Sequence, residues 1–182
     1  KQMSANKPLN NPTDANGLKF RVQNSEVLKA QMAALGGSPQ PMAFSEVYGA
    51  LQTGVVDGQE NTWSNIYGKK FFEVQDGTTE TNHGIIDYLL VTSTDWWDGL
   101  DGEIRVQLST IIAEVTEARN SESTAVNEAA KQEIIAAGGV VRQLSAAQRE
   151  NWVAAMKPVW EQFRGDVGQD NIDAAQAINA KY

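Results

Sequence analysis

The stretch VVDGQENTWSNIYGKKF, residues 55–71, groups side chains that can do chemistry. Asp57 and Glu60 are two nearby carboxylates, the residue type that glycoside hydrolases use in pairs. Asn61 can donate and accept hydrogen bonds, and Trp63 offers a flat apolar wall. The stretch fits a catalytic carboxylate pair or a cradle for a small ligand. Because Asp57-Gly58 is a turn signal and acidic residues favour helix starts, structural roles for the carboxylates are favoured over catalytic ones.

Three residues outside this stretch have the chemistry of a ligand site. Arg21 carries a planar guanidinium that can grip a carboxylate through two parallel hydrogen bonds, although it also fits an arginine on a polar strand face. Phe44 fits a pocket wall or the core. His83, the single histidine, can act as a general base, but a lone histidine more often has a hydrogen-bonded structural role. No Ser/His/Asp or Cys/His arrangement can be argued around it.

The composition excludes several classes of function. The 182 residues contain no cysteine and one histidine, so disulfides and thiol chemistry are absent and a structural zinc site is disfavoured. A formal net charge of −8 disfavours nucleic acid and anionic membrane surfaces as partners. No apolar run approaches the roughly 20 residues of a membrane helix, so we expect no membrane insertion. No phosphate-binding loop or metal-ligand spacing is present, and we expect no cofactor.

The first half of the chain alternates predicted strands and helices. This rhythm indicates an α/β layer with a largely parallel sheet, preceded by a loop over residues 1–17. Ligands of such sheets lie beyond the carboxyl ends of the strands, so Arg21, Phe44 and Asn61 are expected at one rim. The predicted strands cover residues 18–23, 39–44 and 55–56, and the predicted helices cover residues 26–35 and 45–54.

The second half is dominated by one long helical pattern. Residues 101–137 predict a helix of about 55 Å, longer than a small domain is wide. IIDYLLVTS before it has the length of a buried strand, and VVRQL after it predicts another strand. A helix follows in which Pro158 marks a kink or boundary, and a short helix ends the chain.

Four segments together resemble a known family. GLKFRV, the helix ending LGGSP, PMAFSEVYGALQTGVVDGQENTWSNIY and TETNHGIIDYLLVTSTDWW are similar to the periplasmic solute receptors of tripartite ATP-independent (TRAP) transporters, DctP-type. The likeness covers essentially the whole chain, and FSEVYGALQTGVVDGQEN is its most specific part. ENTWSNIY resembles the C4-dicarboxylate branch, because a proline after the asparagine is frequent elsewhere in the family.

The resemblance implies an α/β, periplasmic-binding-protein-like fold with two lobes, mixed sheets and a long helix crossing both. It places the carboxylate-clamping arginine at Arg21, the ligand-orienting asparagine at Asn61 and a pocket aromatic at Phe44. Trp63 and His83 match pocket-lining positions. Family members are nearly twice this long, so we expect a piece of a longer protein that lacks the start of the first lobe.

The resemblance also implies function and domain organisation. We expect a periplasmic receptor, not an enzyme, that binds a small carboxylate and delivers it to TRAP membrane permease subunits. Succinate, malate or fumarate is favoured, and a 2-oxo acid, lactate or sugar acid is the alternative. A hydrolase using Asp57, Glu60 and His83, and a helical interaction module, are the rivals from other classes. The expected boundaries are 1–86 for the ligand-binding lobe, 87–126 for a strand and helix of the other lobe, 127–153 for the return, and 154–182 for helices on the other lobe.

Overall fold

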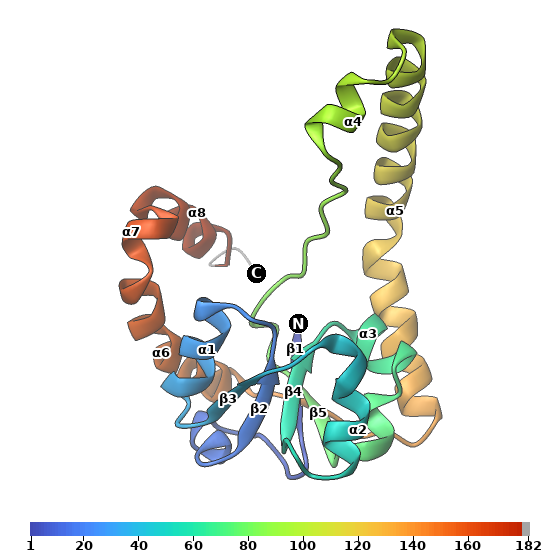
Figure 1. Ribbon diagram of the computed structural model, residues 1–182. Coiled ribbons are helices and arrows are strands. Elements are labelled where there is room, and N and C mark those ends of the chain that lie inside the picture. The colour runs from blue at the N-terminus through green and yellow to red at the C-terminus, as the bar shows by residue number, and fades with distance from the viewer. Residues whose placement is uncertain (180–182) are drawn as a thin grey trace.

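A six-stranded mixed sheet forms the centre of the computed structural model, which describes residues 1–179 (Figure 1). Strand β1 runs antiparallel to both of its neighbours, β4 and β5, and the other neighbouring pairs are parallel. The central place of β1 makes the sheet mixed, as the family resemblance implies. In spatial order the strands are β3 (Ser38–Pro41), β2 (Lys19–Val22), β4 (Gly58–Asn61), β1 (Gln2–Ala5), β5 (Gly77–Glu80) and β6 (Val141–Gln143).

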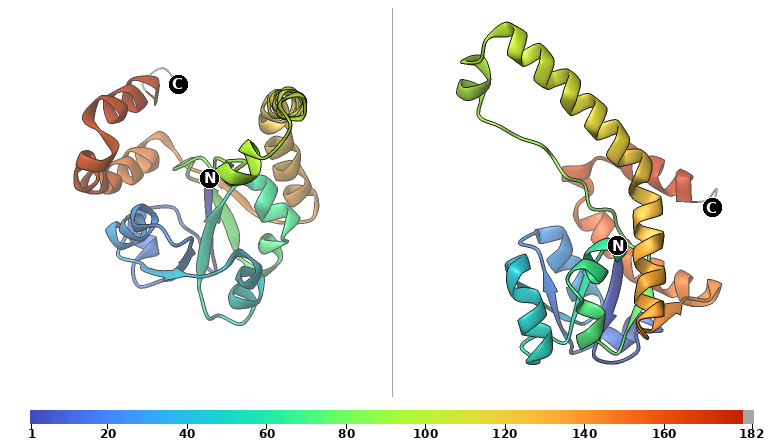
Figure 2. Two further views of the ribbon diagram at one scale, coloured as in Figure 1. Left: turned by 45° about the horizontal axis from the view of Figure 1, so that its top comes forward. Right: turned by 90° about the vertical axis from the view of Figure 1, so that its right-hand side faces the viewer.

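Helices cover both faces of the sheet (Figures 1 and 2). Helices α1 and α6 pack together over one face, and α2, α3 and the lower part of α5 cover the other. The α-helices are α1 (Glu26–Ala34), α2 (Val47–Gln52), α3 (Trp63–Gly68), α4 (Thr94–Asp98), α5 (Gly102–Ala136), α6 (Ala146–Gln162), α7 (Arg164–Val167) and α8 (Gln169–Asn179). Three 3-10 helices are η1 (Pro12–Ala15), η2 (Phe44–Glu46) and η3 (Phe71–Val74).

The sheet separates two apolar cores. On the α1 and α6 face, Phe20 and Val22 of β2 are fully buried with Met3, Met32 and Trp152. On the opposite face, α2, α3 and α5 bury a second group that includes Val47, Trp63, Ile66, Phe71 and Ile134. Burial of a large apolar side chain contributes about 1.5–3 kcal/mol, so both groups fix the helices against the strands.

Helix α1 follows its sequence signals. The Ser25 hydroxyl accepts a hydrogen bond from the backbone N–H of Leu28 at 3.4 Å, which caps the first turn. Beyond its end, Gly36 has a φ of +73°, a left-handed conformation that glycine adopts without steric cost. The predicted cap and stop of this helix are therefore confirmed.

Two predictions for the first half of the chain are wrong. Residues 2–5, predicted as loop, form β1, and all four are buried. The predicted strand at Val55-Val56 is absent, and β4 begins at Gly58. A Cβ at Gly58 would lie 2.6 Å from the Phe20 ring and 2.4 Å from the carbonyl oxygen of Ser4, so this glycine permits close packing inside the sheet. The prediction that Asp57-Gly58 is a turn after a strand is therefore wrong, because Asp57 directly precedes β4 and Gly58 is its first residue.

In the second half of the chain, the predicted helices are confirmed and one predicted strand is wrong. The long helix runs over Gly102–Ala136, close to the predicted 101–137, and α6 continues through Pro158 to Gln162. The predicted strand IIDYLLVTS is wrong: residues 85–93 are extended, form no ladder within residues 1–179, and leave Leu89 85% exposed. A strand needs a neighbour for its backbone hydrogen bonds, and the described residues supply none.

The upper part of α5 projects away from the sheet (Figure 2). Its buried residues, Ala130 and Ile134, both lie near its lower end. Within residues 1–179, no helix combines the length and apolar character needed to cross a membrane.

Candidate functional site

Arg21 is a buried cation without an anionic partner among residues 1–179. It lies on β2 between Phe20 and Val22, points to the opposite face of the sheet, and is only 3% exposed. Its Nε and Nη2 donate to the carbonyl oxygen of Met42 at 3.0 and 2.8 Å, and within residues 1–179 it forms no salt bridge. Burial lowers the pKa of this guanidinium, and the charge of Glu60 partly opposes that shift. The Met42 carbonyl binds one edge of the guanidinium, and Nη1 has no hydrogen-bond acceptor among residues 1–179.

Phe44 lies beside Arg21, as predicted. It begins η2, two residues after Met42, and the Arg21 Cζ is 5.7 Å from its ring centroid. Its ring also makes an edge contact with Phe71 at 5.8 Å between centroids. The segment after β3 therefore supplies both a carbonyl that orients the guanidinium and a ring that flanks it.

Asn61 lies on the same face of the sheet as Arg21. The strand register pairs Arg21 with Gln59, and Asn61 is two residues further along β4, so both side chains project from the same side. Its Oδ1 accepts from the backbone N–H of Thr62 at 3.1 Å and from Asn65 Nδ2 at 2.7 Å. Both acceptor bonds hold the carboxamide so that its Nδ2, which has no acceptor among residues 1–179, can donate to a ligand.

Trp63 opens helix α3, directly after the Thr62 cap. The indole is buried, and Lys131 Nζ of α5 lies 5.9 Å from its ring. It lines a polar cavity of about 480 Å³ together with Lys1, Glu80 and Asn127. Trp63 thus forms a wall at the same end of the sheet as Asn61.

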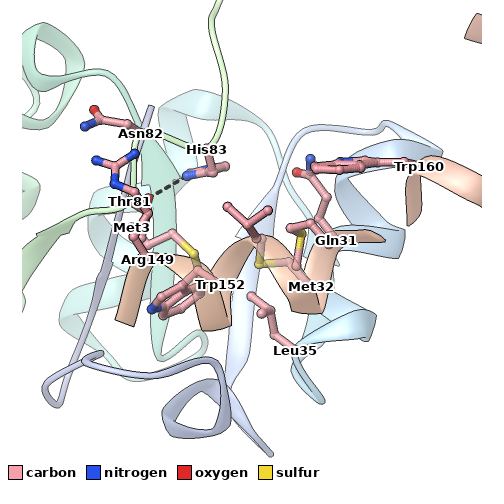
Figure 3. Close-up of a pocket in the computed structure, with 12 residues that line it drawn as sticks. Met3, Gln31, Met32, Leu35, Thr81, Asn82, His83, Arg149, Trp152 and Trp160 are labelled. Atoms are coloured by element: carbon pink, nitrogen blue, oxygen red, sulfur yellow. Dashed lines mark hydrogen bonds between the residues drawn. The ribbon is translucent and has the colours of Figure 1, made fainter. Parts of the chain in front are cut away.

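His83 belongs to a different group on the other face of the sheet. Its Nδ1 is 2.7 Å from Thr81 Oγ1, the contact drawn in Figure 3, and its Nε2 is 3.3 Å from Glu60 Oε2. Lys1 Nζ lies 2.8 Å from the same Glu60 oxygen. Glu60 is the cross-strand partner of Met3, so this group faces α1 and α6, away from Arg21 and Asn61.

Burial and neighbouring charges shift the pKa values of Glu60 and His83 in this cluster. Burial lowers the pKa of His83, although the carboxylate of Glu60 opposes the shift. Burial raises the pKa of Glu60, but hydrogen bonds from His83 and Lys1 and their charges lower it by more, so its net pKa is below the ordinary value. The cluster therefore places a carboxyl group and an imidazole side by side, each with a pKa below its ordinary value.

The larger cavity lies beside His83 and not beside Arg21. It has a volume of about 580 Å³ between α1 and α6, and Figure 3 shows Met32 and Trp152 lining it opposite His83. The structure thus places Arg21 beside Phe44, puts Asn61 on the same face of the sheet with Trp63 two residues further along, and separates His83. Lys1 has no local sequence signal for a role here, because its partner Glu60 is 59 positions away.

The carboxylates of the hydrolase hypothesis do not form a pair. Asp57 Oδ2 accepts from the backbone N–H of Lys19 at 2.8 Å, and its Oδ1 accepts from Asn6 Nδ2 at 3.0 Å, just before β4 begins. Glu60 lies near the other end of β4 and is bound by Lys1 and His83. Within the described part of the chain, no cluster of three or more metal-ligating side chains occurs.

Comparisons with known proteins agree with this architecture. The family described as bacterial extracellular solute-binding protein, family 7 (DctP), matches residues 1–166. The C4-dicarboxylate-binding periplasmic protein DctP of Vibrio cholerae is 63% identical over 181 residues, which are 100% of this chain and 54% of that protein.

Two solved structures have the same fold. A TRAP periplasmic solute binding protein from Shewanella oneidensis with bound succinate superposes with a TM-score of 0.94 at 46% identity, covering 98% of this chain and 59% of that one. A TRAP periplasmic solute binding protein from Pseudomonas aeruginosa with bound L-malate gives 0.86 at 44% identity, covering 88% and 56%. The chain spans about half the length of the curated relatives it matches. By the family match over residues 1–166 and these identities, the chain belongs to the DctP-type bacterial extracellular solute-binding proteins, family 7.

Proposed function

We propose that this chain is the anion-gripping part of a periplasmic TRAP receptor that binds a C4-dicarboxylate such as succinate, malate or fumarate. Arg21 carries the proposal, because it is a buried guanidinium whose only described hydrogen-bond acceptor is one neutral carbonyl. Burial of a cation without an anion costs free energy, which an anionic ligand would offset. A carboxylate fits the planar guanidinium because it can accept two parallel hydrogen bonds. The receptor would deliver the acid to TRAP membrane permease subunits.

Each neighbour of Arg21 has a separate part in this proposal. The Asn61 Nδ2 would donate to the same carboxylate or to an adjacent hydroxyl. Phe44 and Trp63 would close the site with apolar walls, which exclude water and strengthen the ionic contact. His83 would not contact the ligand directly. It would act through Glu60, which it contacts and which precedes Asn61 on β4. Arg21 therefore determines the charge of the ligand, and Asn61 orients it.

Highly exposed apolar side chains support a second lobe. Ile85, Tyr88, Leu89, Leu90 and Val91 are each 79–85% exposed, which is unusual for consecutive apolar positions. We propose that residues 1–86 and 127–153 form the anion-binding lobe. Residues 87–126 would belong to a second lobe, and the helices from residue 154 onward would pack on that second lobe. Closure of both lobes would follow from greater affinity of the ligand for the closed state.

A thermal-shift screen with a receptor of full family length that contains this chain tests the function. A ligand that binds only the folded state raises its stability, so the C4-dicarboxylates are expected to raise the melting temperature most. Pyruvate, lactate, sialic acid and sugar acids form the comparison panel. If none of these acids stabilises the receptor, the proposed function is wrong; if a sugar acid or 2-oxo acid stabilises it most, only the substrate assignment is wrong.

A further inference from the structure

The long helix α5 caps the first turn of α3. Asn127 Oδ1 accepts a hydrogen bond from the backbone N–H of Ser64 at 3.2 Å, while its Nδ2 donates to the carbonyl oxygen of Ser123 at 2.9 Å. Ser64 is the second residue of α3, and the N–H groups of a first turn have no acceptor within their own helix. Helix α5 supplies that acceptor from 63 positions along the chain.

Lys131 makes a second link to the same region. It lies one turn after Asn127 on the same side of α5, and its Nζ is 2.7 Å from Glu80 Oε1 at the end of β5. The same ammonium group lies 5.9 Å from the Trp63 ring, a cation–π distance. The side chains of Lys131 and Glu80 are 14% and 16% exposed, so solvent screens this ion pair little.

Both links act on the part of α3 that holds the proposed anion site. Trp63 is the first residue of α3, and Asn65 in the same turn donates to Asn61 Oδ1. A shift of this turn would therefore change the orientation of the Asn61 carboxamide and the position of the Trp63 wall. Among residues 1–179, neither Asn127 nor Lys131 forms a hydrogen bond or ion pair with Arg21 or Asn61, so we expect their influence on a ligand to be indirect.

We infer that Asn127 and Lys131 are positioning residues of the anion site, which hold the first turn of α3 so that Asn61 and Trp63 meet the ligand. The inference rests on the proposed function. It also explains the partly buried Lys131–Glu80 pair, because ion pairs removed from water often contribute little net stability compared with apolar residues of similar volume. Their contribution lies in fixing geometry.

The test compares succinate affinity, measured by calorimetry, in receptors of full family length. Lys131→Met keeps the apolar stem and removes the ammonium group, and it is expected to weaken succinate binding by about 3-fold to 30-fold, the range of an indirect coupling. Lys131→Arg is expected to restore affinity, because a guanidinium can pair with Glu80 and stack on the Trp63 indole. If Lys131→Met weakened binding only through lost packing, the positive charge of Lys131→Arg would not be needed to restore succinate affinity.

The matched control is Lys29→Met. Lys29 Nζ also lies 2.7 Å from a glutamate oxygen, that of Glu26, but on α1 at the other face of the sheet. This variant is expected to bind succinate like the wild type. A weakening equal to that of Lys131→Met would overturn the inference, as would unchanged affinity in Lys131→Met.

A ligand-free measurement separates this inference from the proposed function. In Asn127→Ala, hydrogen exchange of the Ser64 amide is expected to speed up by about tenfold, because its acceptor is lost. Unchanged exchange would overturn the link between α5 and α3. If the wild type bound none of the acids, the proposed function and the positioning role would both be wrong, whereas succinate binding that Lys131→Met leaves intact would overturn the positioning role alone.

Discussion

Arg21 and Asn61 project from neighbouring parallel strands onto one face of the sheet, two register positions apart. Arg21 pairs with Gln59, and Asn61 ends β4 just beyond it. Both side chains are 3% exposed, and each is held on one side by its own structural hydrogen bonds, Arg21 by the Met42 carbonyl and Asn61 by Thr62 and Asn65. Each has a donor group without an acceptor among residues 1–179, and this supports the proposed anion site.

Replacement of Arg21 tests the ionic contact. Arg21→Ala is expected to cost about 2–5 kcal/mol of affinity for succinate, measured by calorimetry, because it removes one partner of a buried charge pair. Arg21→Lys should also weaken binding, since an ammonium group cannot use the Met42 carbonyl and a carboxylate in the same planar geometry. Arg149→Ala, which removes an exposed arginine of α6, is the control, and near-normal affinity in Arg21→Ala would refute the assignment.

Replacement of Asn61 tests the orienting donor. Asn61→Asp keeps the acceptor oxygen for Thr62 and Asn65 but replaces the free amide group with negative charge, so it is expected to repel a carboxylate and abolish measurable binding. Asn61→Ala removes the donor without adding charge and should cost about 1.5–3 kcal/mol, the range of a hydrogen bond to a charged group. Equal effects of the two variants would show that Asn61 acts through α3 and not through a direct contact.

The Glu60 and His83 cluster predicts how stability depends on pH. Burial lowers the pKa of His83 below its ordinary 6.5, so unfolding allows proton uptake and the free energy of unfolding falls as pH drops below that value. The net pKa of Glu60 is also lowered, so its stabilising contribution is present above pH 4.5 and is lost as pH falls through the folded-state pKa. Both groups reduce stability in acid.

His83→Gln separates the two contributions. Glutamine does not titrate, so urea unfolding of this variant should show a smaller loss of stability than the wild type between about pH 7 and about pH 5. The decline at lower pH, which belongs to Glu60, should become smaller but persist, because Lys1 still pairs with Glu60. If the free energy of unfolding of His83→Gln falls between about pH 7 and about pH 5 as steeply as that of the wild type, His83 is not the titrating group.

The exposed apolar side chains of residues 85–93 are expected to be buried by a second lobe in the longer receptor. In a receptor of full family length, Leu89→Ser is expected to lower the free energy of unfolding by about 1.5–3 kcal/mol, the contribution of one buried leucine. In the 182-residue chain alone, where Leu89 is 85% exposed, the same change should have little effect. Urea unfolding of both proteins makes the comparison, and equal effects in the two would argue against the lobe.

Local signals predicted the elements whose patterns are regular. Helix α1 has a serine cap and a glycine stop, and α5 has a long helical pattern, so both were found close to their observed ends. Strand β1 was missed because QMSA is buried on both faces and shows no alternation. Its polar side chains are satisfied by distant partners, such as Gln59 for Ser4 and Asn82 for Gln2. No local pattern reveals such pairs.

The sequence by itself determined the chemistry available to the site: one guanidinium, one carboxamide and two aromatic rings in segments typical of a carboxylate receptor. Only the tertiary structure decided which of these act together. Consecutive strand residues point to opposite faces, so the register of β4 with β2 and β1 places Asn61 with Arg21, and Glu60 with His83 on the other side. That division depends on strand pairing over long sequence distances, and a shift of one residue would reverse it.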